Sequence, residues 1–256
     1  GISSSGALIN SGASPATYAG AITLGNTISL NVSAGDITLS GAIGGSFAIT
    51  KAGTNTLTLS GNNTYSGATT ISAGTLKVSS ATGLGTTAGG VTISDGAQLS
   101  LSSGITIADA IGVTGSGGGS GAILNTSGDN KITGLVSLSG ATTIGSTSGT
   151  LTFDVSSGNA ITGTQNLTFT GAGNVTVADP IATSTGTLTK SGAGTLTLSG
   201  ANSYTGATTV SAGTLTVDGS LSDSTAVSVA TGATYNVNAN DTIGSIAGAG
   251  TVTTST

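Results

Sequence analysis

Aliphatic and polar residues alternate along many short stretches of this chain. Three examples are Thr56-Leu57-Thr58-Leu59, Leu76-Lys77-Val78 and Ile105-Thr106-Ile107. Alternation of period two places the aliphatic side chains on one face of a strand and Thr, Ser or Lys on the other. The pattern predicts many short, half-buried β-strands, and no stretch has the periodicity of an amphipathic helix.

Turn residues separate these predicted strands every few positions. Typical separators are Ser60-Gly61-Asn62-Asn63 and Ser94-Asp95-Gly96, in which Gly, Asn and Asp tolerate the positive φ that tight turns require. One-sided burial of the strands then predicts one continuous core. Eight residues are expected to point into it: Leu57, Leu59, Leu76, Val78, Leu196, Leu198, Leu215 and Val217. Four are expected to point outward: Thr58, Lys77, Thr197 and Thr216.

One long segment occurs twice in the chain. The segments 50–78 and 189–217 align without a gap at an offset of 139 residues, so that Lys51 corresponds to Lys190 and Tyr65 to Tyr204. Weaker similarity extends outward on both sides of the two segments. The chain is therefore predicted to consist of two copies of one long module.

The module boundary is predicted within the glycine-rich stretch 112–121, with a first solenoid module over residues 1–115 and a second over 116–256. A sequence such as GSGGGSG can be a flexible linker. Because the strand pattern continues on both sides, we favour a wide loop on one continuous rod.

Stacked parallel turns explain this recurrence better than an antiparallel sandwich does. In a solenoid each turn lies on the previous one with about 4.8 Å between strands, so similar residues and similar turns recur. A sandwich of hairpins gives no reason for a module to repeat. With roughly 20 to 25 residues per turn, the chain is expected to form about 10 to 13 rungs and a rod roughly 50 to 60 Å long.

The composition suits a protein with a thin apolar core. Hydrophobic residues make up 36% of the chain and charged residues 5%, whereas disordered chains carry more charge and fewer branched apolar residues. Cys, His, Met and Trp are absent, which excludes a disulfide framework and a thiolate metal site. The net charge of −5 is spread thinly, which argues against nucleic acid as a partner.

The chain has no predicted membrane span or export signal of its own. No apolar stretch approaches the roughly 20 residues that cross a bilayer. The first residues also lack the basic and apolar segments of a signal peptide. Export is therefore expected to depend on elements outside this chain.

The two segments resemble a known bacterial repeat. The sequences TNTLTLSGNNTYSGATTISAGTLKV and GTLTLSGANSYTGATTVSAGTLTV are similar to the autotransporter-associated β-strand repeat, also called the passenger-associated transport repeat. The resemblance implies an all-β fold, a single-stranded right-handed parallel β-helix, carried to the bacterial surface through a C-terminal outer-membrane β-barrel. It also implies a role of the repeat in translocation and passenger folding. The chain shows neither the signal peptide nor the barrel of a full autotransporter.

An enzyme is weighed as an alternative, because β-helices also host polysaccharide lyases and hydrolases. Glycosidic cleavage needs two carboxylates that face the scissile bond. All the acidic residues here are aspartates, mostly next to turn residues: Asp36, Asp95, Asp109, Asp129, Asp154, Asp179, Asp218, Asp223 and Asp241. The basic residues of a lyase could only be Lys51, Lys77, Lys131 or Lys190, and a serine hydrolase lacks its histidine. No catalytic residue and no cofactor is predicted.

Two binding features have simpler structural explanations. Residues 238–241 and 128–130 could offer oxygens to calcium, but they also serve as turn residues, and no calcium-loop signature is present, so no metal site is predicted. Tyr65 and Tyr204 could stack on sugars. We favour the alternative that each covers the end of a rung and hydrogen-bonds a turn.

These observations predict a non-enzymatic structural or adhesive rod of a bacterial cell-surface or secreted protein. A self-assembling filament or surface-layer subunit is the second hypothesis. The expected partners are neighbouring solenoid segments or further copies stacked end to end, with surface glycans or other cells as further possibilities. The expectation of end-to-end stacking rests on the sequence at both ends, where residues 1–10 and 248–256 show an uncapped strand pattern.

Overall fold

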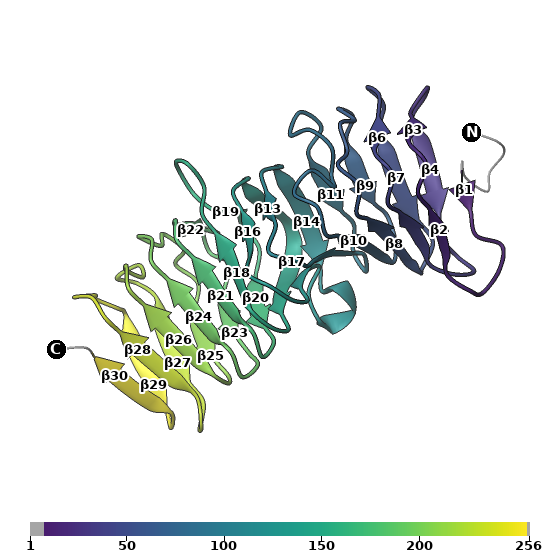
Figure 1. The fold of residues 1–256 in the computed structure, drawn as a ribbon. Helices are drawn as coiled ribbons and strands as arrows, with labels where there is room; N and C mark the ends of the chain where they lie inside the picture. Colours follow the sequence, from purple (N-terminus) through teal and green to yellow (C-terminus); the bar gives the residue numbers. More distant parts are fainter. Residues whose placement is uncertain (1–7, 255–256) are drawn as a thin grey trace.

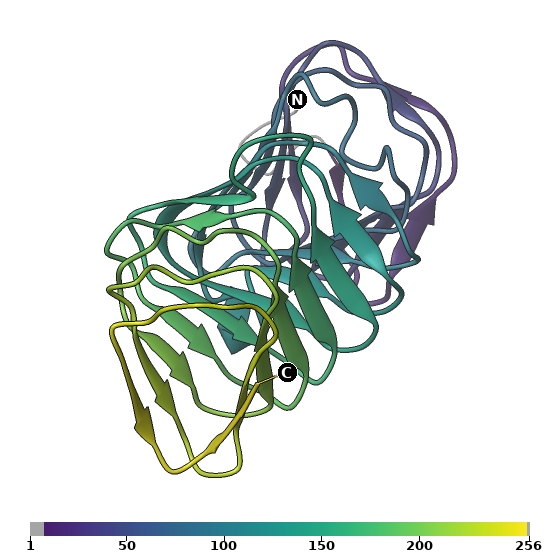
Figure 2. The ribbon, with the colours of Figure 1, turned by 90° about the vertical axis from the view of Figure 1, so that its left-hand side faces the viewer.

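Parallel β-strands stack in successive solenoid turns to form a rod (Figure 1). The computed structural model describes residues 8–254. Most of the predicted strand pattern of residues 1–10 lies outside that range, as do the last two residues of the pattern at 248–256. Viewed toward one end, the turns outline a three-sided section (Figure 2). About 11 turns stack along the rod, within the predicted range.

Three ladders of parallel strands make three faces. The first face consists of β1 (Leu8–Ile9), β4 (Ile28–Asn31), β7 (Ile49–Ala52), β9 (Thr69–Ile71), β11 (Val91–Ile93), β14 (Ile111–Gly115), the start of β17 (Val136–Ser146), β19 (Ile161–Gly163) and β22 (Ile181–Ala182). The second face consists of β2 (Ala16–Tyr18), β5 (Ile37–Leu39), β8 (Thr56–Leu59), β10 (Thr75–Val78), β12 (Gln98–Leu101), β15 (Ile123–Asn125), the end of β17, β20 (Leu167–Thr170), β23 (Leu188–Lys190), β25 (Thr208–Val210), β27 (Ala226–Val229) and β29 (Ser245–Gly248).

The third face begins with a short pair and continues as an eight-stranded ladder. Its strands are β3 (Ile22–Thr23) and β6 (Ile43–Gly44), then β13 (Thr106–Ile107), β16 (Asn130–Ile132), β18 (Thr150–Phe153), β21 (Asn174–Val177), β24 (Thr195–Leu198), β26 (Thr214–Val217), β28 (Thr234–Val237) and β30 (Thr251–Thr254). Every strand pair among residues 8–254 is parallel, which confirms the solenoid and excludes the antiparallel sandwich. No helix in that range is long and apolar enough to cross a membrane.

The core runs along the axis of the rod as one cluster. The eight residues predicted to point inward all belong to it and are at most 1% exposed. The four residues predicted to point outward are half-buried, as expected for positions that alternate with the core residues on the same strands. Alternation therefore identified the buried face of these strands correctly.

The glycine-rich stretch makes a wide corner loop that includes the short 3-10 turn η1 (Gly117–Gly119). Strand pairing continues past this loop, because β12 pairs with β15 and β14 with β17. In the next turn, β17 extends across the same corner and joins the first and second faces into one 20-stranded sheet. The division into modules 1–115 and 116–256 stays a prediction.

The two similar segments lie on different faces of the rod. In the first copy, β7 to β10 alternate between the first and second faces. In the second copy, β23 to β26 alternate between the second and third faces. The second copy is therefore displaced by one face relative to the first, and equivalent residues of the two copies do not share a ladder.

Candidate functional site

Each segment copy buries a lysine at a corner of the rod. Lys51 is 0% exposed and Lys190 is 3% exposed. Each lies two positions after an inward-pointing residue, Ile49 or Leu188, and so points to the same side of its strand. Lys51 Nζ donates to the carbonyl oxygens of Ala52, Gly53 and Ala73 at 3.1, 2.7 and 2.9 Å. Burial lowers the pKa of both lysines to about 8, and the charge of Asp36 opposes this shift at Lys51.

Each copy also buries a tyrosine that bonds a threonine of the next strand. Tyr65 Oη lies 2.6 Å from Thr69 Oγ1, and Tyr204 Oη lies 2.8 Å from Thr208 Oγ1. Both rings are 0% exposed. Burial raises the pKa of both phenols, so they stay protonated. Rings in this position support the core and cannot stack on a sugar from outside.

A buried asparagine in each copy joins three consecutive turns. Asn63 accepts from Ile43 N at 2.9 Å and donates to Gly83 O at 2.7 Å. Its counterpart Asn202 accepts from Ile181 N at 3.0 Å and donates to Ser220 O at 2.9 Å. Such side chains satisfy main-chain groups that the corner leaves without a ladder partner.

Aspartates also serve main-chain groups of adjacent turns. Asp36, Asp129, Asp179 and Asp241 each accept a backbone N–H of a neighbouring turn at 2.7–3.0 Å. Asp218 accepts from the Asn238 amide at 2.7 Å. This is the turn role that the sequence indicated for these residues. Within residues 8–254, His, Cys, Asp and Glu side chains do not gather in groups of three.

Asp109 differs from these aspartates. Its side chain is 3% exposed, and its Oδ1 is one of two buried side-chain oxygen or nitrogen atoms without a hydrogen-bond partner among the described residues. The other is the Tyr235 hydroxyl, whose pKa is raised to about 12 by burial and by the charge of Asp241. Burial raises the pKa of Asp109 to about 6, so the carboxylate is charged and poorly solvated at neutral pH.

Replacing Asp109 with Asn is expected to change how stability depends on pH. The raised pKa means that the folded chain binds this proton more tightly than the unfolded chain, so the stabilisation is present below pH 3.8 and is lost as the pH rises through 6. The Tyr65 phenol, whose pKa is raised by burial and by the charge of Asp109, stays neutral over this pH range and adds no charge to the balance. Urea unfolding at pH 4.5 and 7 should show that the free energy of unfolding of Asp109→Asn, relative to that of the wild type, rises by roughly 2 kcal/mol between the two pH values. If the free energies of unfolding of the two proteins changed with pH in parallel, this prediction would be contradicted.

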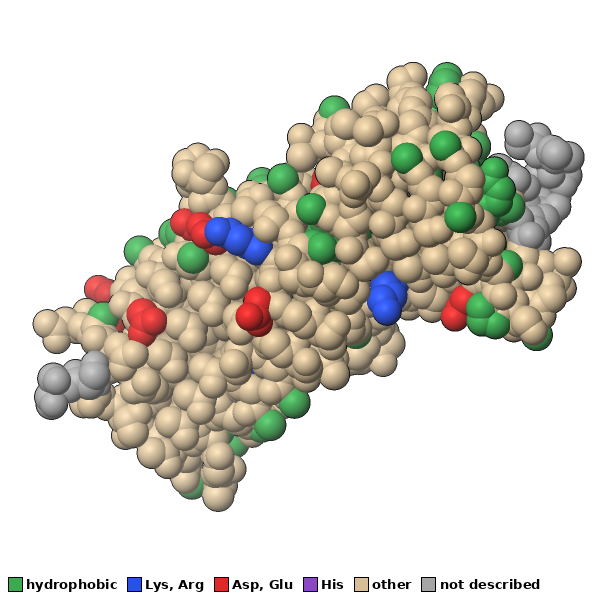
Figure 3. Space-filling view, viewed as in Figure 1, with side chains coloured by type: hydrophobic (Ala, Val, Ile, Leu, Met, Phe, Trp, Pro, Cys, Tyr) green, Lys and Arg blue, Asp and Glu red, His purple; other side chains and the backbone are tan. Residues whose placement is uncertain are grey.

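A shallow polar groove on the outer surface contains a charged pair. Lys131 and Asp154 form an ion pair with half-exposed side chains. Two hollows of about 390 and 500 Å³ adjoin at Thr133, Val155 and Ser156, and the larger one includes the ion pair. Elsewhere on the face seen in Figure 3, charges are isolated among uncharged polar groups. An exposed pair of this kind contributes little to stability.

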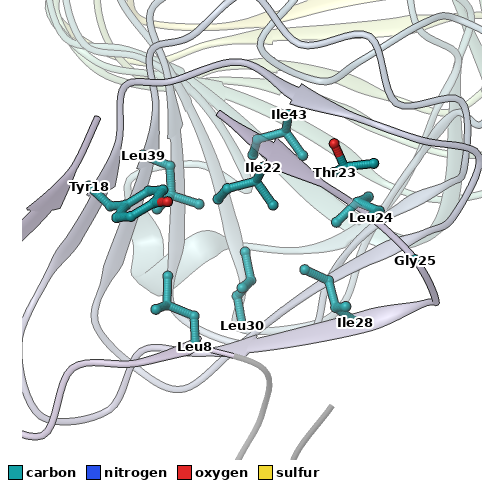
Figure 4. A pocket seen from close by; sticks show the side chains of 10 residues that line it. All are labelled: Leu8, Tyr18, Ile22, Thr23, Leu24, Gly25, Ile28, Leu30, Leu39 and Ile43. Atoms are coloured by element: carbon teal, nitrogen blue, oxygen red, sulfur yellow. The ribbon is translucent and has the colours of Figure 1, made fainter. Parts of the chain in front are cut away.

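An apolar hollow of about 260 Å³ lies at the first rungs (Figure 4). Leu8, Tyr18, Ile22 and Leu30 point toward one another from strands of three different faces. At the opposite end, Ile246 and Val252 are 48% and 49% exposed. The end rungs of residues 8–254 thus expose side chains of the type that other rungs bury.

Lys51 and Lys190 are equivalent positions of the two segments, but their equivalence alone does not predict burial. The available signal was parity, since Ile49-Thr50-Lys51 and Leu188-Thr189-Lys190 place each lysine on the side of the core residue. The sequence pattern places Asn63 in a turn, and nothing local singles out Asn202. Their equivalence at the same offset was the signal that could have singled them out.

Comparison with known families matches both segments. Residues 49–78 and 188–217 each match the passenger-associated-transport-repeat. The chain therefore carries two copies of this repeat, which confirms the resemblance of the two segments. A comparison with curated proteins and one with solved structures gave no significant match.

Proposed function

We propose that this chain is a non-enzymatic, structural or adhesive segment of a bacterial passenger rod that is displayed on the cell surface or secreted. The observation that carries the proposal is the presence of two passenger-associated transport repeats within a continuous solenoid. This repeat family is generally structural and belongs to secreted or cell-surface proteins. The buried polar groups of both repeats are engaged with main-chain or threonine partners, which supports a role in holding turns together.

A direct test combines shape, cleavage and adhesion. Small-angle scattering of the purified chain should give an elongated particle, and incubation with a panel of polysaccharides should release no new reducing ends. Labelled chain should bind cells or immobilised glycans through an extended face, so that no single surface substitution abolishes binding. Cleavage that copurifies with the chain, and that disappears in a Lys131→Ala variant, would overturn the proposal in favour of an enzyme.

A filament or layer subunit is the second candidate function. It is favoured by the apolar hollow at the first rungs together with exposed Ile246 and Val252 on the last rungs. Among residues 8–254, β1 and β30 each pair with a strand on one side alone, and a parallel solenoid turn of this or another chain could continue the ladders. Partners of this kind are neighbouring solenoid segments.

Light scattering across a range of concentrations separates the two candidates. A filament subunit should grow with concentration, and Val252→Lys should prevent growth by placing a charge at the joint. Thr216→Lys, at an outward position of β26, two strands before β30 on the third face, is the matched control and should grow as the wild type does. A wild type that stays monomeric at all concentrations removes this candidate and leaves the rod proposal intact.

A further inference from the structure

The buried lysines sit in cages of main-chain oxygens. Lys190 Nζ donates to the carbonyl oxygens of Ser191, Gly192 and Ala212 at 3.1, 2.8 and 3.1 Å. The three acceptors of Lys51 occupy the equivalent positions. The two cages have the same geometry although they lie on different faces of the rod. The arrangement therefore belongs to the repeat itself and not to one set of neighbours.

Each cage spans two turns. Two of its oxygens come from the two residues after the lysine, and the third comes from the next turn, 22 residues further along the chain. For Gly192 O and Ala212 O, the lysine is the hydrogen-bond donor found among the described residues. Removing the lysine would leave these partly buried carbonyls without that donor, which is costly.

The geometry of the cage matches an ammonium ion. A neutral amine has two N–H donors, whereas the protonated form has three, one for each of the three carbonyl oxygens within 3.1 Å of Nζ. Burial lowers the pKa of both lysines, but only to about 8, so the proton is retained at neutral pH.

A glycine makes room for the ammonium group. Gly213 has φ of +67°, and a Cβ added there would lie 2.8 Å from Lys190 Nζ and 2.5 Å from Gly192 O. Gly74 holds the same place in the first copy, with φ of +64° and a Cβ position 2.5 Å from Gly53 O. The Lys-x-Gly and Ala-Gly elements shared by both copies are thus parts of one cation site.

Another turn shows that this corner needs a donor. Asn125, at the end of β15 on the second face, is 0% exposed and donates to Gly128 O at 3.1 Å and to Ser148 O of the next turn at 2.8 Å. The neutral Asn125 amide thus bridges two consecutive turns, as the Lys190 ammonium group does. The lysine differs in serving three carbonyls with a full positive charge.

We propose that each repeat builds a main-chain carbonyl site for one primary ammonium group, and that the lysine is its resident ligand. The lysine joins two consecutive turns as an internal cation, a role that other proteins give to a bound metal ion. When the lysine side chain is shortened, the site is open to a free primary alkylammonium ion of matching length.

The test is chemical rescue of Lys190→Ala, which lacks three methylenes and the ammonium group. Its melting temperature is expected to fall by roughly 10 °C. Refolding in propylammonium chloride should restore at least half of that loss in a saturable way. Tetramethylammonium chloride, which has the charge but no N–H donor, should restore none.

Lys77→Ala is the matched control, because Lys77 is half-buried on the outward side of β10. It should melt within about 2 °C of the wild type and gain nothing from propylammonium. A Lys190→Ala variant with wild-type stability, or an equal response of both variants to the amine, would overturn the proposal.

A second measurement applies even if Lys190→Ala does not fold. Acetylation of the folded wild type should modify Lys77 and Lys131 at least tenfold faster than Lys51 and Lys190. The latter two are at most 3% exposed, and each of their Nζ atoms donates to three carbonyl oxygens. Modification of all four at similar rates would show that the cages are not occupied as proposed.

Discussion

Replacing Leu196 with aspartate is expected to lower the free energy of unfolding by more than about 4 kcal/mol, measured by urea denaturation at pH 7. Leu196 is 0% exposed and stacks between Val175 of the preceding turn and Leu215 of the following one. A carboxylate there would lie among aliphatic side chains without a partner. The loss of apolar burial adds to the cost of the buried charge.

The adjacent residue provides the control for this substitution. Thr197 lies on the same strand with the opposite parity and is half-buried. Thr197→Asp keeps its carboxylate in contact with water, so we expect a loss of about 1 kcal/mol, mostly from the poor strand propensity of aspartate. Equal losses for the two variants would mean that the inward and outward assignments are wrong at this rung.

Replacing Gly213 with alanine is expected to destabilise the chain by about 3 kcal/mol, measured in the same way. One part of this cost is the positive φ of +67°, which strains any residue with a Cβ. The other part is contact, because the new methyl group would lie 2.5 Å from the carbonyl oxygens of Gly192 and Gly194. Two main-chain oxygens of the preceding turn cannot move aside without disturbing their own corner.

Gly96→Ala isolates the first part of that cost. Gly96 has φ of +76° at a corner turn, and no atom lies within 4 Å of the position of an added Cβ. We expect this variant to lose only about 1 kcal/mol. If Gly213→Ala lost no more free energy of unfolding than Gly96→Ala, adjacent turns would not approach each other closely at the lysine corner.

The strands and the core could be predicted from the sequence because both depend on a local pattern. Leu57 and Leu59 alternate with threonines within a few residues, and alternation alone determines which side is buried. The corners were harder, since their geometry depends on residues of the neighbouring turn. Nothing local to Lys51 indicates that Ala73, in the next turn, supplies its third carbonyl.

The displacement of the second repeat by one face also could not be predicted. The offset of 139 residues is plain in the sequence, but the length of a turn is not constant. Paired residues lie 19 positions apart for Leu57 and Leu76 and 25 apart for Val136 and Ile161. Because the turns vary by several residues, the offset does not state how many of them separate the two copies.

That displacement has a consequence for how such rods can grow. The same repeat folds with equal burial of its lysine, asparagine and tyrosine whether it begins on the first face or on the second. Two corners of the rod therefore host the same repeat, and a duplicated segment need not span a whole number of turns to be accommodated. An insertion the length of a single face would preserve the core and rotate every outward side chain beyond it onto a neighbouring side. Gene duplication could in this way redistribute surface residues around the axis without altering a single inward-facing residue.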